Sequence, residues 1–163
     1  MTHTPASPEA LMARYRAGQR HFEGLQLAGW ALARAVLLDA DLRRTDLSGA
    51  CLEGATLVRA RLQRARLDDA NLTRAMLIKA NLAEASLRNA TMVCAALDKA
   101  TLSNADLSHA DLSGARLTQV RFFGANLNGA NLSRSDLTSA LLAGATLEGA
   151  NLDHADCFGA VLS

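Results

Sequence analysis

The chain has 163 residues, of which half are hydrophobic and only 4% aromatic, and its formal net charge at pH 7 is +1. This length corresponds to one domain, and the near-neutral charge excludes a bulk electrostatic attraction to nucleic acid or to membrane surfaces. The sequence has no apolar run long enough to span a bilayer, and residues 1–10 lack the apolar segment of a signal peptide. A cytoplasmic location is therefore expected.

Residues 1–20 do not share the pattern of the rest of the chain, and we predict a disordered start over residues 1–6 followed by a short capping helix. The tripeptide Ser7–Glu9 is typical of an N-cap, a proline at the first helical position and an acid in the first turn. Leu11 and Tyr15, four residues apart, would share one face of this helix and rest on the structure that follows.

From residue 40 onward the sequence repeats every five residues. Ala occupies the 25 positions from Ala40 to Ala160 with three exceptions, and Leu occupies the 25 from Leu42 to Leu162 with three exceptions. A period of five does not fit a regular helix, in which successive Leu residues would spiral around the axis. It does not fit a flat strand either, because an odd period sends successive Leu side chains to opposite faces. The chain must therefore bend once per repeat and stack each unit on its neighbours.

Ten of the eleven glycines fall two residues after the Leu position. One slot that favours glycine predicts a backbone with positive φ, as at the third position of a type II turn. Between Gly54 and Gly114 the slot holds other residues, so this stretch is expected to use a different turn or a strained one.

The runs Ala105–Ser108, Ala110–Gly114 and Ala130–Ser133 resemble the A(D/N)LxX consensus of pentapeptide repeat proteins, and the resemblance extends over residues 21–163. It implies an all-β fold, a right-handed, four-sided parallel β-helix with one pentapeptide per side. The chain would then form about seven coils, in a rod of about 34 Å at the usual spacing between strands.

The repeat continues to Ser163 without a closing element, so the last coil is expected to expose Leu142, Phe158 and Leu162. Either a second copy stacks on this end and forms a two-fold dimer, or the last residues fold across it. The residues expected in a dimer contact are Phe123, Leu141, Phe158, Val161 and Leu162.

The three cysteines are expected to be structural or incidental thiols. Cys157 occupies a Leu position and should be buried. Cys51 and Cys94 should lie two coils apart, at about 10 Å, which is too far for a disulfide.

Placing residues 20 apart above one another sorts the outward side chains into faces, two of which carry charge. The acidic face combines Asp46, Asp68, Asp69, Asp106 and Glu148 with Arg66 and Arg88. The neighbouring face and its corners carry a basic patch of Arg43, Arg44, Arg59, Arg61, Arg64 and Arg66. Solvated surface is the simpler interpretation of both, and a binding role is the alternative.

A third face carries apolar residues in outward positions of three consecutive coils. These residues are Val36, Leu38, Val58, Met76 and Ile78. A contiguous exposed apolar patch indicates a protein contact, with the nearby arginines as its polar rim. The alternative is that these positions merely tolerate residues that favour strands.

The sequence contains no catalytic constellation and no set of residues with metal-ligand spacing, so neither an enzyme nor a bound cofactor is expected. His109 and His154, for example, belong to different faces, and the many Ser and Asp residues are repeat consensus residues.

Two functions remain. The first is a protein-interaction scaffold or regulator that presents rigid faces to an unidentified protein. The second follows from the resemblance, since some pentapeptide repeat proteins mimic DNA and protect or inhibit DNA gyrase. The small net charge of the acidic face disfavours the second function, because B-DNA carries about one negative charge per 1.7 Å. Direct binding of nucleic acid through the basic patch is weaker still, because the patch has no aromatic residues for stacking.

Overall fold

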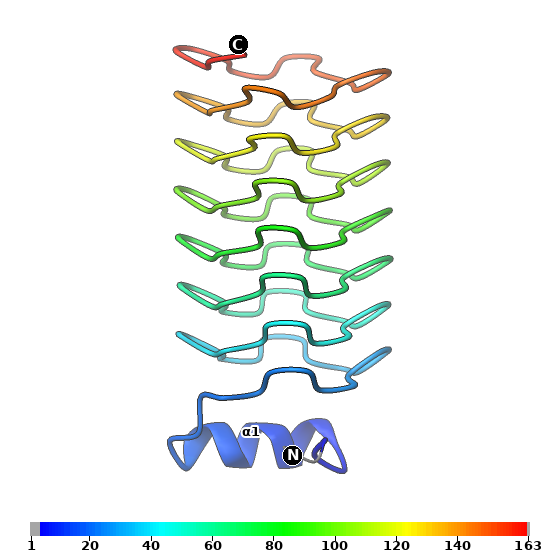
Figure 1. The fold of residues 1–163 in the computed structure, drawn as a ribbon, viewed down its shortest axis with the longest axis vertical. Coiled ribbons are helices and arrows are strands. Elements are labelled where there is room, and N and C mark those ends of the chain that lie inside the picture. The colour runs from blue at the N-terminus through cyan, green and yellow to red at the C-terminus, as the bar shows by residue number, and fades with distance from the viewer. Residues whose placement is uncertain (1–3, 163) are drawn as a thin grey trace.

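The computed structural model describes residues 4–162, in which helix α1 (Pro8–Arg16) is followed by a column of stacked coils (Figure 1). The coils pair through parallel β-bridges, the first between His21 and Asp41 and the last between Leu141 and Val161. Each bridge joins residues 20 apart, so one coil has four sides of five residues. The described residues include no helix that is long and apolar enough to cross a membrane.

Four of the five backbone N–H groups in a typical repeat are satisfied by the main chain. The N–H of Leu87 donates to the carbonyl of Asp106 in the next coil at 2.7 Å, and the N–H of Ala90 donates to Leu87 across the corner turn at 3.1 Å. The residue directly after each core Leu is the exception, because its N–H has no main-chain acceptor in the described part of the chain.

Asp or Asn directly before the core Leu satisfies this remaining N–H. In one repeat, Asp106 Oδ1 accepts a hydrogen bond from the N–H of Ser108 at 3.0 Å, and Asn131 Oδ1 does the same for Ser133 at 3.1 Å. A short side chain with an acceptor oxygen suits this two-residue reach. The second letter of the repeat consensus is therefore explained by one otherwise unpaired donor.

Every corner from Gly24 to Gly159 has the same backbone conformation, with positive φ two residues after the core position. The glycines have φ of 63–73°, and the non-glycine residues from Arg59 to His109 have φ of 55–60°. The suggestion that this stretch uses a different turn is wrong, and the strained alternative is correct. Left-handed backbone costs a residue with a side chain roughly 1–2 kcal/mol.

The interior is filled by stacked Leu and Ala side chains. From Leu47 to Leu142, the residues at the Leu position are at most 3% exposed, including the substitutes Met92 and Phe122. Two polar residues replace Ala, and each satisfies its hydroxyl locally. Thr45 donates to the carbonyl of Phe22 at 3.0 Å, and Ser135 donates to the carbonyl of Leu132 at 2.7 Å.

Helix α1 lies across the N-terminal end of the column (Figure 1). Ser7 Oγ accepts a hydrogen bond from the N–H of Ala10 at 3.3 Å and so caps the first turn. The helix ends in a Schellman arrangement, in which Gly18 and Gln19 donate to carbonyls of the last turn.

Two residues of α1 attach the helix to the coils. Leu11 is fully buried, and the Tyr15 hydroxyl donates to the carbonyl of Leu38 at 3.0 Å. The expected disordered start over residues 1–6 lies partly outside the described residues, which begin at Thr4. Thr4 Oγ1 accepts a hydrogen bond from the N–H of Gln26 at 3.3 Å, so this residue contacts the first coil.

The opposite end of the column is uncovered. Phe158 is 80% exposed and Leu162 66% exposed, as predicted, but Leu142 is only 3% exposed because a further coil lies over it. The prediction that Cys157 is buried is wrong, since no coil covers its side chain. A shallow apolar cavity of about 150 Å³ opens at this end, lined by residues that include Leu137, Leu147 and Leu162.

We expect the cost of core truncation to depend on the position along the column. Leu87→Ala should lower the free energy of unfolding by about 2–5 kcal/mol, because it leaves a cavity between packed coils. Leu152 occupies the same position of the repeat but is 39% exposed, so Leu152→Ala should lower the free energy of unfolding clearly less. Urea denaturation of both variants checks this, and equal losses would contradict the uncovered end.

Candidate interaction surfaces

The apolar residues predicted to form a patch lie on one face of the column. Bridges stack Val36, Thr56 and Met76 in consecutive coils, and Leu38, Val58 and Ile78 follow two residues later on the same side. Val36 is 50% exposed and Met76 42% exposed, while Leu38, Val58 and Ile78 are partly exposed. We call Val36, Leu38, Val58, Met76 and Ile78 the apolar stripe.

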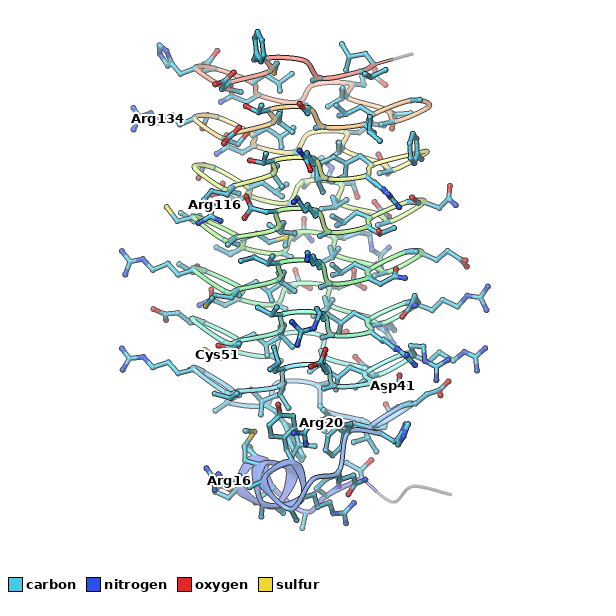
Figure 2. The ribbon with its side chains drawn as sticks, turned by 90° about the vertical axis from the view of Figure 1, so that its left-hand side faces the viewer. Arg16, Arg20, Asp41, Cys51, Arg116 and Arg134 are labelled. Carbon is cyan, nitrogen blue, oxygen red and sulfur yellow. The ribbon has the colours of Figure 1, made fainter. Side chains whose placement is uncertain are left out.

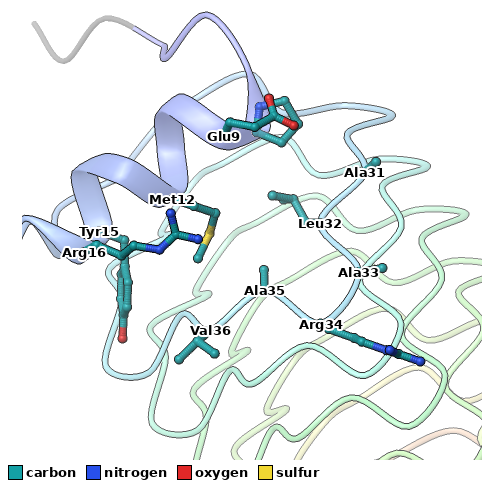
Figure 3. Close-up of a pocket in the computed structure, with 11 residues that line it drawn as sticks. Glu9, Met12, Tyr15, Arg16, Ala31, Leu32, Ala33, Arg34, Ala35 and Val36 are labelled. Atoms are coloured by element: carbon teal, nitrogen blue, oxygen red, sulfur yellow. The ribbon is translucent and has the colours of Figure 1, made fainter.

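The two ends of the apolar stripe differ. Toward the C-terminus it stops at an ion pair between Arg116 and Asp98, 2.5 Å apart. Toward the N-terminus it continues into a groove of about 450 Å³ between α1 and the first coil. Figure 3 shows Met12 of α1 facing Leu32 across this groove, with Val36 at its edge.

The six arginines of the predicted basic patch do not form a free positive surface. Five of them pair with carboxylates, and these contacts are Arg43 with Asp41 and Glu23, Arg44 with Glu23, Arg59 with Asp39, Arg64 with Glu84, and Arg66 with Asp46. In the described part of the chain, Arg61 is the one member without a carboxylate partner. The patch is therefore mostly a set of ion pairs between neighbouring coils.

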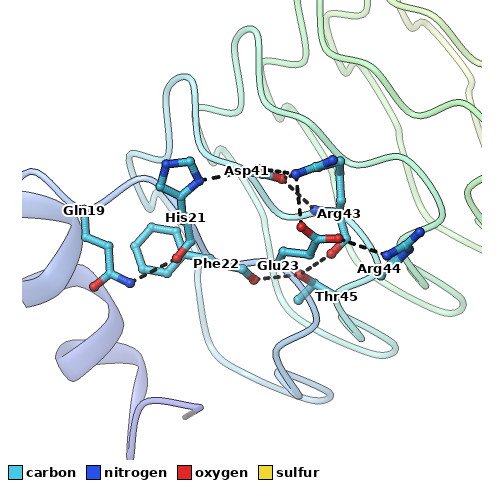
Figure 4. Close-up of polar contacts among 8 residues, drawn as sticks. All are labelled: Gln19, His21, Phe22, Glu23, Asp41, Arg43, Arg44 and Thr45. Atoms are coloured by element: carbon cyan, nitrogen blue, oxygen red, sulfur yellow. Dashed lines mark hydrogen bonds and ion pairs between the residues drawn. The ribbon is translucent and has the colours of Figure 1, made fainter. Parts of the chain in front are cut away.

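The most enclosed of these pairs is centred on Asp41, whose side chain is buried. Arg43 donates to both of its carboxylate oxygens at 2.7 Å and reaches Glu23 in the preceding coil at 3.0 Å (Figure 4). The hydrogen bonds from Arg43 hold the pKa of Asp41 below its ordinary value, although burial opposes this. These contacts bind the first coils together beside α1.

The acidic face is also partly neutralised. Asp68, which is 7% exposed, accepts hydrogen bonds from Ser86 and from the Arg88 side chain in the next coil. Burial raises the pKa of Asp68, but the bonds from Arg88 and Ser86 outweigh it, and the pKa lies below the ordinary value. The carboxylates of this face therefore act mainly as links between coils.

Four further cations without a carboxylate partner in the described part of the chain lie at the corners that border the apolar stripe. Arg34 and Arg74 occupy one corner, and Lys79 and Lys99 occupy the other. Among residues 4–162, none of these four has a carboxylate oxygen within 4.0 Å. These four cations were not predicted, because the corners on both sides of the apolar face were not compared at steps of 20 residues. The positions two residues after the Leu, read at steps of 20, would have revealed both corners.

The described residues contain no group of His, Cys, Asp and Glu that could hold a metal ion. A polar hollow of about 520 Å³ is lined by Cys94, Arg134 and His154, three residues of one corner column, and the Arg134 side chain extends outward from the coils (Figure 2). Cys51 and Cys94 are free thiols, in agreement with the predicted absence of a disulfide between them. Phe123, Leu141 and Val161 gather near the uncovered end, where bridges stack Leu141 and Val161.

A family model for pentapeptide repeats matches the chain in eight copies over residues 21–163. The chain belongs to the pentapeptide repeat family. Membership implies the right-handed, four-sided β-helix, and the bridges between residues 20 apart agree with it.

Solved structures of the same kind resemble the chain over most of its length. HetL, a protein involved in heterocyst differentiation regulation in the cyanobacterium Nostoc, is 25% identical, with 98% of this chain and 94% of HetL covered and a TM-score of 0.31. Rfr23 of the cyanobacterium Cyanothece is 26% identical, with coverages of 92% and 97% and a TM-score of 0.26.

A trypsin-treated form of QnrB1, a plasmid-mediated fluoroquinolone resistance protein, is 15% identical, with coverages of 94% and 86% and a TM-score of 0.48. No curated protein sequence matches the chain. Family membership therefore rests on the repeats themselves.

Ionised Asp68 should stabilise the fold in a pH-dependent way. Because its folded-state pKa is lowered, the contribution is present above the pKa of the unfolded carboxyl, about 3.9, and is lost as the pH falls through the folded-state value. Asp68→Asn should therefore cost about 1–3 kcal/mol at about pH 7 and much less at about pH 2. Urea titrations at both pH values measure the difference, and the adjacent exposed Asp69→Asn is the control. A cost that does not change with pH would refute this role.

Proposed function

We propose that this protein is a non-enzymatic interaction scaffold, and that the apolar stripe is its contact surface for a partner protein. The observation that carries the proposal is the exposure of Val36 and Met76 on a fold whose other outward positions are mostly polar. Apolar surface in a contiguous patch is favourable to cover. The coils hold it in place before binding, so little conformational entropy is lost when a partner docks.

The unpaired corner cations add to this support. Lone charges beside an apolar surface give a contact its orientation, because a partner with the opposite charge is favoured and one with like charge is repelled. The predicted basic patch contributes less, since most of its arginines already have partners.

The alternative, a DNA mimic that acts on gyrase, has less support. A DNA duplex as long as this column carries on the order of 20 negative charges, counted over both strands. Here two carboxylates of the acidic face, Asp46 and Asp68, are paired with Arg66 and Arg88.

The proposal also includes a role for the N-terminal helix. Helix α1 acts as the N-terminal cap of about seven coils, because it places Leu11 and Tyr15 over the first one. A capped end cannot pair with another solenoid, which limits uncontrolled association. We also propose that the protein is cytoplasmic.

Val58→Asp/Ile78→Asp should abolish capture of the partner from a soluble lysate of the source organism. The exchange is compatible with the fold because the next residue of the same column is already Asp98. Thr73→Asp/Ser113→Asp, in the equivalent positions of the adjacent face, is the matched control and should retain the partner. Circular dichroism verifies folding. Equal retention by both variants would rule out the stripe, and capture of gyrase subunits would favour the alternative.

The uncovered C-terminal coil is a second contact surface, and we propose that it binds a second copy of the chain. Phe158, Val161 and Leu162 are exposed there, beside the open apolar cavity. A two-fold contact would cover these side chains in both copies.

Phe158→Asp/Leu162→Asp should convert a dimer into a monomer without a change in fold. Light scattering coupled to size-exclusion chromatography measures the mass. Phe123→Ser tests whether the dimer contact extends to Phe123 on the side of the column. A wild-type protein that stays monomeric at high concentration would contradict self-association.

A further inference from the structure

The apolar stripe has dimensions that restrict what can lie on it. From Val36 to Met76 there are two steps between bridged coils, which corresponds to about 10 Å at the usual spacing between strands. Across the face, Met76 and Ile78 are two residues apart, or about 7 Å. The surface is therefore narrow, and its longer dimension is parallel to the axis of the column.

We propose that the occupant of the apolar stripe is an amphipathic α-helix of a partner protein whose apolar face is bordered on both sides by Asp or Glu. The proposal deepens the scaffold function and rests on it. A stripe of about 10 Å matches about seven residues, or two turns, of a helix lying along the column. Apolar side chains at i, i+3 or i+4, and i+7 would then contact successive coils.

An added β-strand does not fit this face, because its backbone groups are already used between coils. The carbonyl of Met76 accepts from Leu57, and the carbonyl of Ile78 accepts from Arg59. Strand addition needs alternating donors and acceptors along an edge. Among residues 36–78 of this face, the groups left over in successive coils are donors, the N–H groups of Leu38, Val58 and Ile78, and no carbonyl alternates with them from coil to coil.

These N–H groups have no Asp or Asn beside them, because Val36, Thr56 and Met76 take that position. A donor left without an acceptor favours an oxygen-bearing partner. Carboxylates at the border of an apolar helix face supply such acceptors at the repeat spacing of the coils.

The corners define the charge of the occupant on both sides. Arg34 and Arg74 stand along one border, and Arg34 lies along the bare corner at Gly54, where an added Cβ would be 3.5 Å from its Cγ. Lys79 and Lys99 stand along the other border. Arg59 in that column is already neutralised by Asp39 at 2.7 Å. A helix with acidic residues on both flanks satisfies the four unpaired cations at once, as complementary interfaces do.

The N-terminal groove extends the same surface. It is lined by Met12, Leu32 and Ala35 and shares Val36 with the apolar stripe. A helix longer than two turns could therefore continue over Val36 toward α1. A lipid surface fits less well, since three of the five stripe residues are only partly exposed and stable membrane attachment needs a larger apolar area.

The test is a selection of helical peptides displayed on yeast, with about 16 randomised residues, against the full immobilised chain. Enriched peptides should have apolar residues at helical spacing and a negative net charge. A synthetic copy of the best one should bind roughly thirtyfold more weakly to the Val58→Asp/Ile78→Asp variant, as for loss of a central contact. It should bind roughly tenfold more weakly to Lys79→Glu/Lys99→Glu. Arg121→Glu/Arg134→Glu, two cations away from the stripe, is the matched control and should leave binding unchanged.

Other outcomes would overturn the proposal and also locate the error. Enriched peptides that are basic, or that ignore the stripe variants, would refute the acidic helix. If the lysate capture above still depends on the stripe, the scaffold function survives and only the occupant is wrong. Stripe-dependent sedimentation with phosphatidylcholine–phosphatidylglycerol vesicles, without any selected peptide, would replace the helix by a lipid surface. Independence from the stripe in every assay would remove both proposals.

Discussion

The hydrogen-bond ladder between residues 20 apart is the constraint on which the rest of this structure depends. It sets the length of a coil, and a coil of four sides closes only if the chain bends every five residues. Each bend requires positive φ, and each side must place one Leu inward. The ladder leaves one N–H per repeat without a main-chain acceptor, and the Asp or Asn of the consensus satisfies it.

The same ladder decides which surfaces are available for binding. Neighbouring coils bring charges from positions 20 apart to within contact distance, so Arg43, Arg64 and Arg88 find carboxylates and stop being free cations. Among residues 4–162, the cations beside the apolar stripe stay unpaired because the residues stacked on them at the corners carry no carboxylate. Charge counted per face from the sequence therefore overstates how much of it a partner would meet.

Much of the fold was predictable because a five-residue period requires a chain that bends once per repeat and stacks, and the resemblance to pentapeptide repeat proteins implied four sides per coil. The positions of α1 and of the stripe followed from capping residues and from outward apolar residues. The burial of Leu142 and the exposure of Cys157 were not predicted, because both depend on which coil is last rather than on the repeat. The pairing of Arg59 with Asp39 was not predicted, although the two residues are 20 apart and therefore stack in neighbouring coils.

The strict coil length has a consequence for how such a chain tolerates insertions. One added pentapeptide preserves the Leu register and the corner turns, so the interior is unaffected. Every later residue, however, moves on by one side of the square, a rotation of about a quarter turn. A pentapeptide inserted between Val58 and Met76 would leave a well-packed column, but the two parts of the apolar stripe would lie on different faces. The packing of the interior therefore requires only that the core Leu recur every five residues. A binding face requires more, because its residues align only when they are 20 apart.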